Sequence, residues 1–181
     1  MKILDLGCGE NKVKIKNYRV IGVDKKITKE VDLICDIDRN LPFKDFSFDV
    51  VYAQDVLEHL ENPFNIVIEV HRILKKNGTF NVKVPFFSSV AAHDTDHKRF
   101  FNYSSFDYFT CEKKNYPEYG KYKFKMIKRK IIYNLGNYEK FFWPISKLIT
   151  FLINLSPKIF QNSLLAYLFP SCYIIFKMKK I

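Results

Sequence analysis

Cysteine is scarce in this chain. The four that occur lie far apart, at Cys8, Cys35, Cys111 and Cys172. No two of them form a C-x-x-C pair, which excludes a zinc knuckle and a dithiol redox motif. We expect Cys8 and Cys35 to act as small apolar fillers of the interior. Free, scattered thiols fit a reducing compartment, so we predict a cytoplasmic protein.

Acidic residues are also few, with 19 Asp and Glu against 30 Lys and Arg, for a net charge of +11. A basic excess of this size favours an anionic partner, such as RNA, an acidic membrane surface or a phosphorylated metabolite. A lysine-rich surface that merely keeps the protein soluble explains the same charge. Both interpretations stay open.

The chain has no apolar run of the roughly 20 residues that a transmembrane helix requires. Its strongest apolar segments lie within residues 141–169 and are limited by Pro144, Pro157 and Pro170. The chain opens directly on an apolar strand, so we expect no signal peptide. With 48% hydrophobic and 17% aromatic residues in 181, it has enough apolar material for one folded domain.

A third glycine is missing after the first strand. The apolar run that starts at Lys2 leads into Gly7-Cys8-Gly9, and a second apolar run, residues 19–23, ends in Asp24. A strand, G-x-G and a strand ending in Asp is a nucleotide-binding pattern, in which the carboxylate holds the ribose hydroxyls. The full dinucleotide fingerprint is G-x-G-x-x-G. Here Glu10 follows instead, and its carboxylate would repel a pyrophosphate but tolerate a sulfonium and an amino group.

The first 85 residues resemble the class I S-adenosylmethionine-dependent methyltransferases. The matching segments are LDLGCG at 4–9, VIGVD at 20–24, CDI at 35–37, LPFKDFSFDVVYAQDVLEHL at 41–60, EVHRILKKNGTF at 69–80 and NVKVP at 81–85. The loop VPFFSSVAAHDTDHKRFF at 84–101 is similar to that of a small group of methyltransferase type 11-like proteins. The resemblance implies a doubly wound, mostly parallel, Rossmann-like α/β sheet of seven strands with the last strand reversed.

The resemblance also implies S-adenosyl-L-methionine as the cofactor and a set of residues that bind it. Gly7 and Gly9 would contact the methionine part, Asp5 would lie near its amino group, and Asp24 would hold the ribose. The full set is Asp5, Gly7, Cys8, Gly9, Asp24, Asp36, Ile37 and Gln54. Asp36 would accept a hydrogen bond from the adenine, although Asp36 and Asp38 could equally be ordinary turn residues.

The pattern along the chain predicts a single methyltransferase domain over residues 1–181. Residues 1–85 form the cofactor-binding half, and 86–134 hold a lid loop, a short helix over 104–110 and a basic strand. Residues 135–171 form an apolar helical cap, inserted before a last strand at 172–181. Strands are predicted at 2–6, 19–24, 31–35, 48–53, 79–84 and 122–133, with a helix over 63–76. Only residues 10–18 join the first two strands, so the first helix is short or missing.

Three histidines are the candidate catalytic bases or substrate contacts: His59, His93 and His97. Histidine is the side chain most readily poised for proton transfer near neutral pH. His59 follows the fourth strand, at the edge where ligands bind in open α/β sheets. It could act as a base or orient its loop by a hydrogen bond, and the orienting role is favoured. His93 and His97 flank Asp94 and Asp96 in the lid loop. Their spacing matches no standard zinc site, so no metal site is predicted.

The predicted reaction is methyl transfer to an O or N atom of a small or lipid-linked acceptor. An RNA or protein acceptor is the alternative. The basic stretch 112–130, with Tyr116, Tyr119 and Tyr122, could contact RNA, but the N-P-P-Y tetrapeptide typical of methylation of bases and glutamine is absent after the fourth strand. A second alternative is a non-catalytic, cofactor-binding partner subunit. Residues 141–169 could cover the substrate site, form a homodimer or contact an anionic membrane, and a buried cap is the default expectation.

Overall fold

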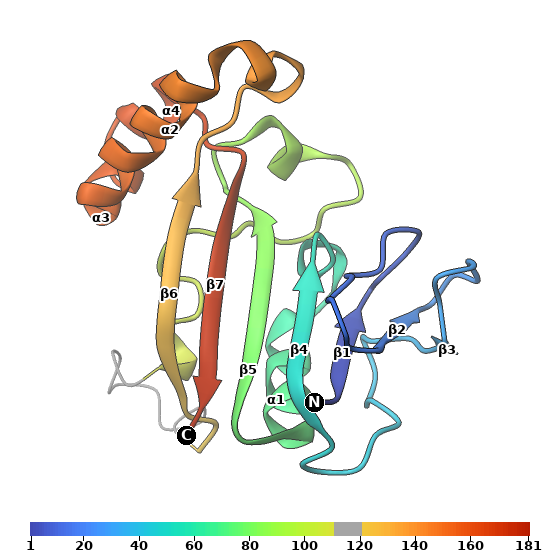
Figure 1. Ribbon diagram of the computed structural model, residues 1–181. Helices are drawn as coiled ribbons and strands as arrows, with labels where there is room; N and C mark the ends of the chain where they lie inside the picture. The colour runs from blue at the N-terminus through green and yellow to red at the C-terminus, as the bar shows by residue number, and fades with distance from the viewer. Residues whose placement is uncertain (111–120) are drawn as a thin grey trace.

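A seven-stranded sheet runs through the whole molecule in the computed structural model, which describes residues 1–110 and 121–181. The strand order is β3-β2-β1-β4-β5-β7-β6, and β7 alone runs antiparallel to its neighbours (Figure 1). The strands are β1 (Ile3–Leu6), β2 (Val20–Asp24), β3 (Leu33–Ile34), β4 (Phe48–Gln54), β5 (Leu74–Pro85), β6 (Phe124–Ile132) and β7 (Tyr173–Lys180). The predicted reversed last strand is therefore confirmed.

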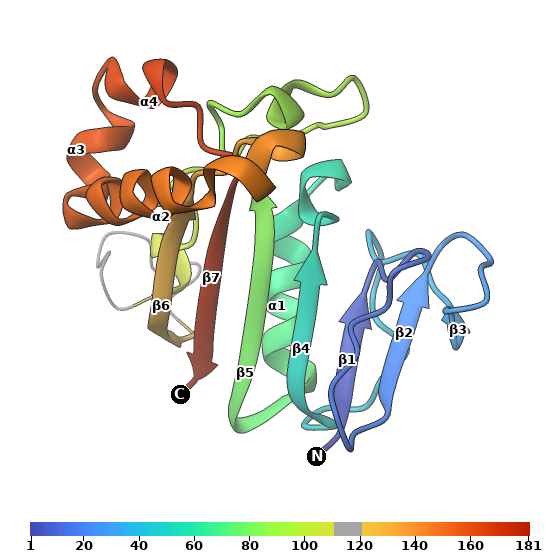
Figure 2. The same cartoon turned by 45° about the horizontal axis from the view of Figure 1, so that its top comes forward.

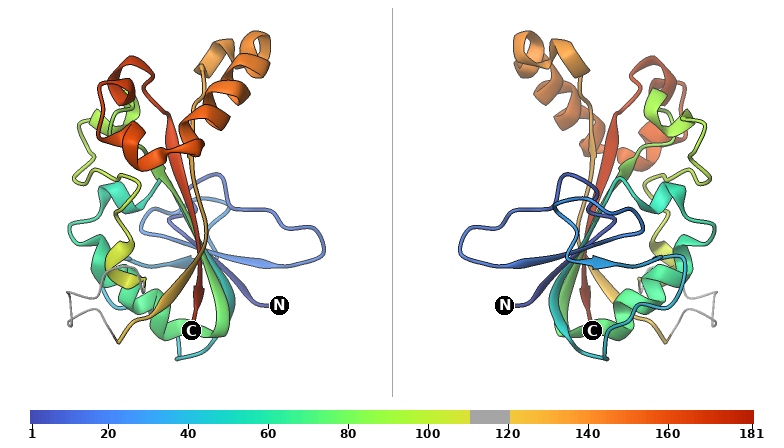
Figure 3. Two further views of the ribbon diagram at one scale, coloured as in Figure 1. Left: turned by 90° about the vertical axis from the view of Figure 1, so that its left-hand side faces the viewer. Right: turned by 90° about the vertical axis from the view of Figure 1, so that its right-hand side faces the viewer.

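One helix, α1 (Pro63–Ile73), covers a face of the sheet beside β4 and β5, as the two side views in Figure 3 show. It begins at Asn62, whose side chain accepts a hydrogen bond from the Phe64 backbone N–H, and Pro63 occupies its first turn. Its apolar stripe, Ile66, Val67, Val70 and Ile73, is fully buried. This helix therefore supplies much of the core beside β4 and β5.

The segment between β1 and β2 contains no helix among its residues, all of which the structure describes. The chain from Gly7 to Arg19 is instead an irregular loop with one small bridge, Ile15 to Tyr18. The side chain of Asp5 holds this loop by accepting a hydrogen bond from the Val13 N–H (2.7 Å). The expectation of a missing first helix is confirmed.

Several predicted boundaries differ from the structure. α1 ends at Ile73 rather than at 76, because Leu74 already pairs with Phe48 at the start of β5. β3 keeps only two of its five predicted residues. The short helix predicted over 104–110 is one 3-10 turn, Asp107–Phe109. The calls on Tyr116 and Tyr119 lie outside the described residues.

Three helices stand between β6 and β7, as the cap prediction requires: α2 (Glu139–Leu155), α3 (Pro157–Gln161) and α4 (Leu165–Leu168). They lie beyond the end of β6, at the same end of the molecule as the carboxyl end of β5 and the 86–102 loop (Figures 1 and 2). No helix among the described residues is long and apolar enough to cross a membrane.

The expectation that the cap buries its apolar residues is wrong. Most large apolar side chains of these helices are exposed, including Phe141, Trp143, Leu148, Phe151, Leu152, Leu155, Ile159, Leu164, Tyr167 and Leu168. The buried positions of α2 are Ser146, Thr150 and Ile153. Thr150 and Asn154 on this inward face hydrogen-bond backbone groups of Tyr133 and Ile131 around the end of β6, which accounts for polar side chains there.

Candidate active site

Two glycines shape the loop that follows β1. Gly7 (φ 65°) and Gly9 (φ 49°) both have left-handed backbone conformations, which side chains other than glycine rarely adopt. A Cβ atom added to Gly7 would lie 2.2 Å from Cγ2 of Val56, in the segment after β4. The Cys8 N–H donates to the carbonyl of Val23 (3.1 Å), and its side chain is buried. The loop is thus pressed against the ends of β2 and β4.

Asp24 ends β2 and closes this loop from the other side. One carboxylate oxygen accepts from the Gly9 N–H (3.0 Å) and the other from the Lys26 N–H (2.8 Å). These bonds fix the carboxylate in place, and each oxygen keeps a further acceptor position. Gly7, Gly9 and Asp24, predicted separately from the sequence, therefore form one backbone-lined cradle at the carboxyl ends of β1 and β2.

Asp5 lies beneath the cradle and is only 2% exposed. Burial raises the pKa of its carboxyl to about 6, although the hydrogen bond from Val13 and the charge of Lys12 both act to lower it. Its one described hydrogen bond ties down the loop between β1 and β2. Asp5 is therefore a buried support of the cradle.

The three remaining predicted cofactor residues are less closely joined to the cradle. Asp36 is exposed, accepts from the Asp38 N–H (3.2 Å) and pairs with Arg39 (3.3 Å), which is the geometry of a local turn. Ile37 is buried, and Gln54 is exposed at the end of β4. The turn interpretation of Asp36 therefore accounts for its described contacts.

A second group of polar side chains, which we call the Glu-His cluster, consists of Glu58, His59 and His97. One ligand atom from each side chain lies within 4.8 Å of the other two. The rings of His59 and His97 meet edge to face, with centroids 4.6 Å apart, and Nδ1 of His59 lies 3.2 Å from a carboxylate oxygen of Asp96. Glu58 is 1% exposed, and burial raises its pKa to about 7.

The structure thus brings two of the three predicted histidines together and leaves the third aside. His93 is exposed, and its ring lies beside Phe100 with centroids 5.2 Å apart. The cluster stands close to the cradle along the chain, because Val56, two residues before Glu58, contacts Gly7. A base at His59 or His97 is therefore better placed than one at His93.

Sequence reasoning missed Glu58, which is the most deeply buried member of the cluster. Its position next to His59 in the segment DVLEHL was the available signal. What the sequence could not indicate is that a loop forty residues later folds back onto it. The backbone N–H groups of Lys98 and Arg99 both donate to the Glu58 carbonyl, at 2.8 and 3.1 Å, and place His97 beside it.

Comparisons with known proteins agree with this geometry. Residues 4–82 match the family model of the methyltransferase domain. An uncharacterized protein of Methanocaldococcus jannaschii is 37% identical over 90 residues, which cover 45% of this chain and 40% of that protein. The chain thus spans less than half the length of this curated relative.

Two solved structures share the fold. A SAM-dependent methyltransferase from Archaeoglobus fulgidus has a TM-score of 0.66 at 18% identity, over 99% of this chain and 86% of the other. The methyltransferase in complex with the Trm112 methyltransferase activator of Haloferax volcanii has a TM-score of 0.53 at 22% identity, over 75% and 65%. Residues 4–82 thus match a methyltransferase domain, and the chain shares the fold of S-adenosylmethionine-dependent methyltransferases.

Proposed function

We propose that the protein transfers the methyl group of S-adenosylmethionine to an O or N atom of a lipid-linked or small acceptor. The cradle of Gly7, Gly9 and Asp24 carries this proposal, because its two glycines have no side chain that would keep the methionine part from the backbone, and Asp24 presents a fixed carboxylate to the ribose. Asp5, Cys8, Asp36, Ile37 and Gln54 complete the proposed cofactor set. Transfer needs the nucleophile, the methyl carbon and the sulfur in line, so positioning supplies most of the catalysis.

The acceptor must also lose a proton when its O or N atom attacks. His59 is our leading candidate for the base, since Asp96 lies beside its Nδ1 atom and would orient the ring. His97, in ring contact with His59, is the second candidate, and His93 is the third. His59 follows β4, and His93 and His97 follow β5, so all three come after the carboxyl ends of parallel strands, where ligands bind in such sheets.

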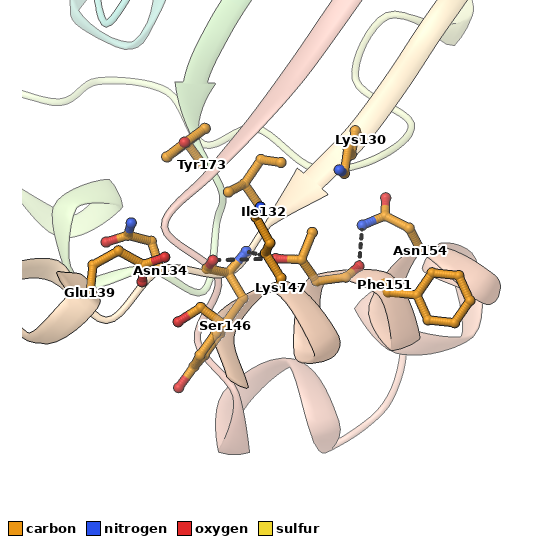
Figure 4. Close-up of a pocket in the computed structure, with 11 residues that line it drawn as sticks. Lys130, Ile132, Asn134, Glu139, Ser146, Lys147, Phe151, Asn154 and Tyr173 are labelled. Carbon is orange, nitrogen blue, oxygen red and sulfur yellow. Dashed lines mark hydrogen bonds between the residues drawn. The ribbon is translucent and has the colours of Figure 1, made fainter. Parts of the chain in front are cut away.

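The outward face of the helical cap supports a lipid-linked acceptor. On the inward face of α2, Thr150 accepts from the Tyr133 N–H (3.0 Å), and Asn154 bonds both the N–H and the carbonyl of Ile131. Figure 4 shows Asn154 close to the end of β6, along a pocket of about 450 Å³. The polar face of α2 packs on the rest of the protein, so its apolar face is exposed. That face is available to contact an apolar environment such as the interior of a membrane.

The positive charge of the same segment favours an anionic membrane as the surface that α2 contacts. From Lys140 to the last residue the sequence contains six Lys and no Asp or Glu. Exposed Lys147 lies over the ring of Trp143, 3.7 Å from its centroid. Aromatic rings with neighbouring lysines are typical of helices that lie in the headgroup region. We infer a protein peripheral to the cytoplasmic membrane surface.

Two other functions have specific support and serve as alternatives. An RNA or protein acceptor would use the basic charge, but Gln54-Asp55-Val56-Leu57 stands where N-P-P-Y is typical. A partner protein is suggested by the Haloferax volcanii methyltransferase, which is bound to an activator. The apolar face of α2 would suit such a partner or a homodimer, and in that case the chain could also be a non-catalytic subunit.

The test combines cofactor binding with the fate of a labelled methyl group. Calorimetric titration of the purified protein should show micromolar binding of S-adenosylmethionine and S-adenosylhomocysteine and no binding of NAD. Asp24→Ala should weaken that binding at least tenfold, whereas Asp94→Ala, a matched change at an exposed residue outside the proposed cofactor set, should weaken it less than threefold. Methyl-labelled cofactor incubated with cell extract should label the lipid fraction. Label in RNA or protein alone would support the alternatives.

A further inference from the structure

The buried carboxylate of Glu58 has no hydrogen-bond partner for either oxygen among the described residues. Nδ1 of His97 is likewise buried without a partner. Burying polar atoms without partners is costly, so a group that satisfies several of them at once is expected at such a place. The three side chains of the Glu-His cluster converge, and a cation between them would satisfy both Glu58 and His97.

We propose that Glu58, His59 and His97 bind a divalent transition-metal ion of the zinc type. Two imidazoles and one carboxylate are the donor set that suits zinc, iron or cobalt, whereas magnesium and calcium prefer oxygen donors alone. The site goes beyond the proposed methyl transfer, and its existence does not depend on that transfer.

The surroundings of His59 and His97 match those of metal ligands. Asp96 lies 3.2 Å from Nδ1 of His59, which leaves Nε2 free to face an ion. Metal-bound histidines usually donate their second ring N–H to a carboxylate in this manner. Lys98 and Arg99 fasten the His97 loop to the Glu58 backbone, so two of the ligands are held together before any ion binds.

The cluster must contract when it is loaded. Tetrahedral bonds of about 2.1 Å set ligand atoms about 3.4 Å apart, against the 4.8 Å within which the atoms now lie. His59, with a side chain 34% exposed, can rotate to close this distance, whereas Glu58 is fixed by burial. Three protein ligands leave one coordination position open to a water molecule or an acceptor group.

An open position gives the ion a role toward the acceptor. An O–H or N–H group that binds there becomes more acidic, so its proton passes to solvent water while the heteroatom stays on the ion. In the loaded protein His59 and His97 are ligands, and the ion takes over the activation that an imidazole base would otherwise supply. The acceptor class favoured by this arrangement carries a hydroxyl or amino group that binds the ion through its single heteroatom.

The test uses the full chain, freed of metal by a chelator and then titrated with Zn²⁺ by calorimetry and with Co²⁺ by visible absorption. We expect one saturable site per chain and visible absorption typical of four- or five-coordinate cobalt. Glu58→Gln and His97→Asn should each weaken binding at least a hundredfold, and Asp96→Asn by about 10–100-fold. Asp94→Asn, in the same loop but outside the cluster, should bind as the unchanged protein does.

Circular dichroism and S-adenosylmethionine titration on each sample show whether a variant is folded. If Glu58→Gln fails to fold, Asp96→Asn, which changes an exposed residue, carries the test. The proposal is overturned if the unchanged protein shows no saturable Zn²⁺ binding, or if Glu58→Gln and His97→Asn keep full affinity. Because these readouts involve no methyl transfer, they separate failure of the ion site from failure of the proposed function.

Discussion

Asp5 is a carboxyl group held at 2% exposure beneath the cradle, with one hydrogen bond from Val13 and no ion pair among the described residues. Burial disfavours its charged form, so its pKa is raised from 3.8 to about 6. An acid with a raised folded pKa stabilises the fold below its unfolded pKa and loses that contribution as pH rises through the folded value. Between about pH 4 and pH 6 the folded protein should therefore become less stable on account of Asp5.

Asp5→Asn should remove this pH dependence, because the amide oxygen can still accept from Val13 and carries no charge. A shift of about two pKa units corresponds to at most about 3 kcal/mol. We expect the variant to gain about 1–3 kcal/mol in free energy of unfolding at pH 7.5 and nothing at pH 4, measured by urea unfolding of the cofactor-free protein.

Asp32→Asn is the control, because the pKa of Asp32 is shifted in the opposite direction to that of Asp5. Hydrogen bonds from Gly22 and Lys12 lower the pKa of Asp32, so its loss should not stabilise the protein at pH 7.5. If Asp5→Asn lowered the free energy of unfolding equally at pH 4 and pH 7.5, the charged form of Asp5 would not destabilise the fold. If the variant is stabilised but binds S-adenosylmethionine less tightly, the negative charge of Asp5 contributes to cofactor binding while it lowers the stability of the cofactor-free protein.

The single residues that the sequence could identify are those whose roles are local. Gly7, Gly9 and Asp24 are set by a strand, a turn and a strand, and the structure joins them as expected. Asp36 also has a local signal, but the same signal fits a turn. The contact of Glu58 with His97 joins segments forty residues apart, and no spacing within one segment encodes it.

Helices and strands could be predicted where the spacing of apolar residues in the sequence matches the side chains that the structure buries. β4 and α1 have clear apolar patterns, and both occur near their predicted places. The end of α1 was missed because strand pairing of Leu74 with Phe48 overrides local helix preference. The orientation of α2 was missed because an amphipathic pattern shows that two faces differ but does not show which face meets the protein.

The apolar face of α2 points away from the protein, and from this orientation we predict how the helix contributes to stability and to membrane binding. Leu148 and Phe151 are 57% and 60% exposed, so replacing both by Gln should leave the free energy of unfolding almost unchanged. Full burial of such side chains in an apolar phase contributes about 1.5–3 kcal/mol each. The double variant should therefore bind anionic vesicles at least tenfold more weakly in a sedimentation assay.

Thr150→Val is the matched control on the opposite face of α2. It removes the hydrogen bonds between Thr150 and the Tyr133 backbone, so it should lower the free energy of unfolding by about 1 kcal/mol. Its vesicle affinity should stay unchanged. A double variant that unfolded more easily while binding vesicles normally would instead mean that the outward side chains are packed within the protein or a homodimer.

At the scale of the molecule, the sheet order places the cradle and the helical cap on opposite sides of β5. The cradle lies at the carboxyl ends of β1 and β2, and the cap helices stand between β6 and β7, at the same end of the sheet (Figure 1). The seven-stranded sheet and the reversed β7 followed from the family resemblance. The direction in which the cap faces did not, since it depends on hydrogen bonds between α2 and the chain around the end of β6.

The net charge of +11 acts together with that apolar face, and the two contributions respond differently to salt. Attraction of lysines to anionic lipid is worth about 1 kcal/mol per residue near the surface and is screened over about 10 Å at 0.1 M salt. Apolar burial of α2 is not screened. Raising salt from about 50 mM to about 500 mM should therefore weaken binding to anionic vesicles and leave a residual affinity, which the Leu148 and Phe151 double variant loses.

Binding to RNA through phosphate contacts would instead fall steeply and continuously with salt, and the double variant would bind RNA normally. Co-sedimentation with vesicles and filter binding with RNA over the same salt series decide between the two partners, because only a membrane-bound protein retains a salt-resistant fraction that depends on α2.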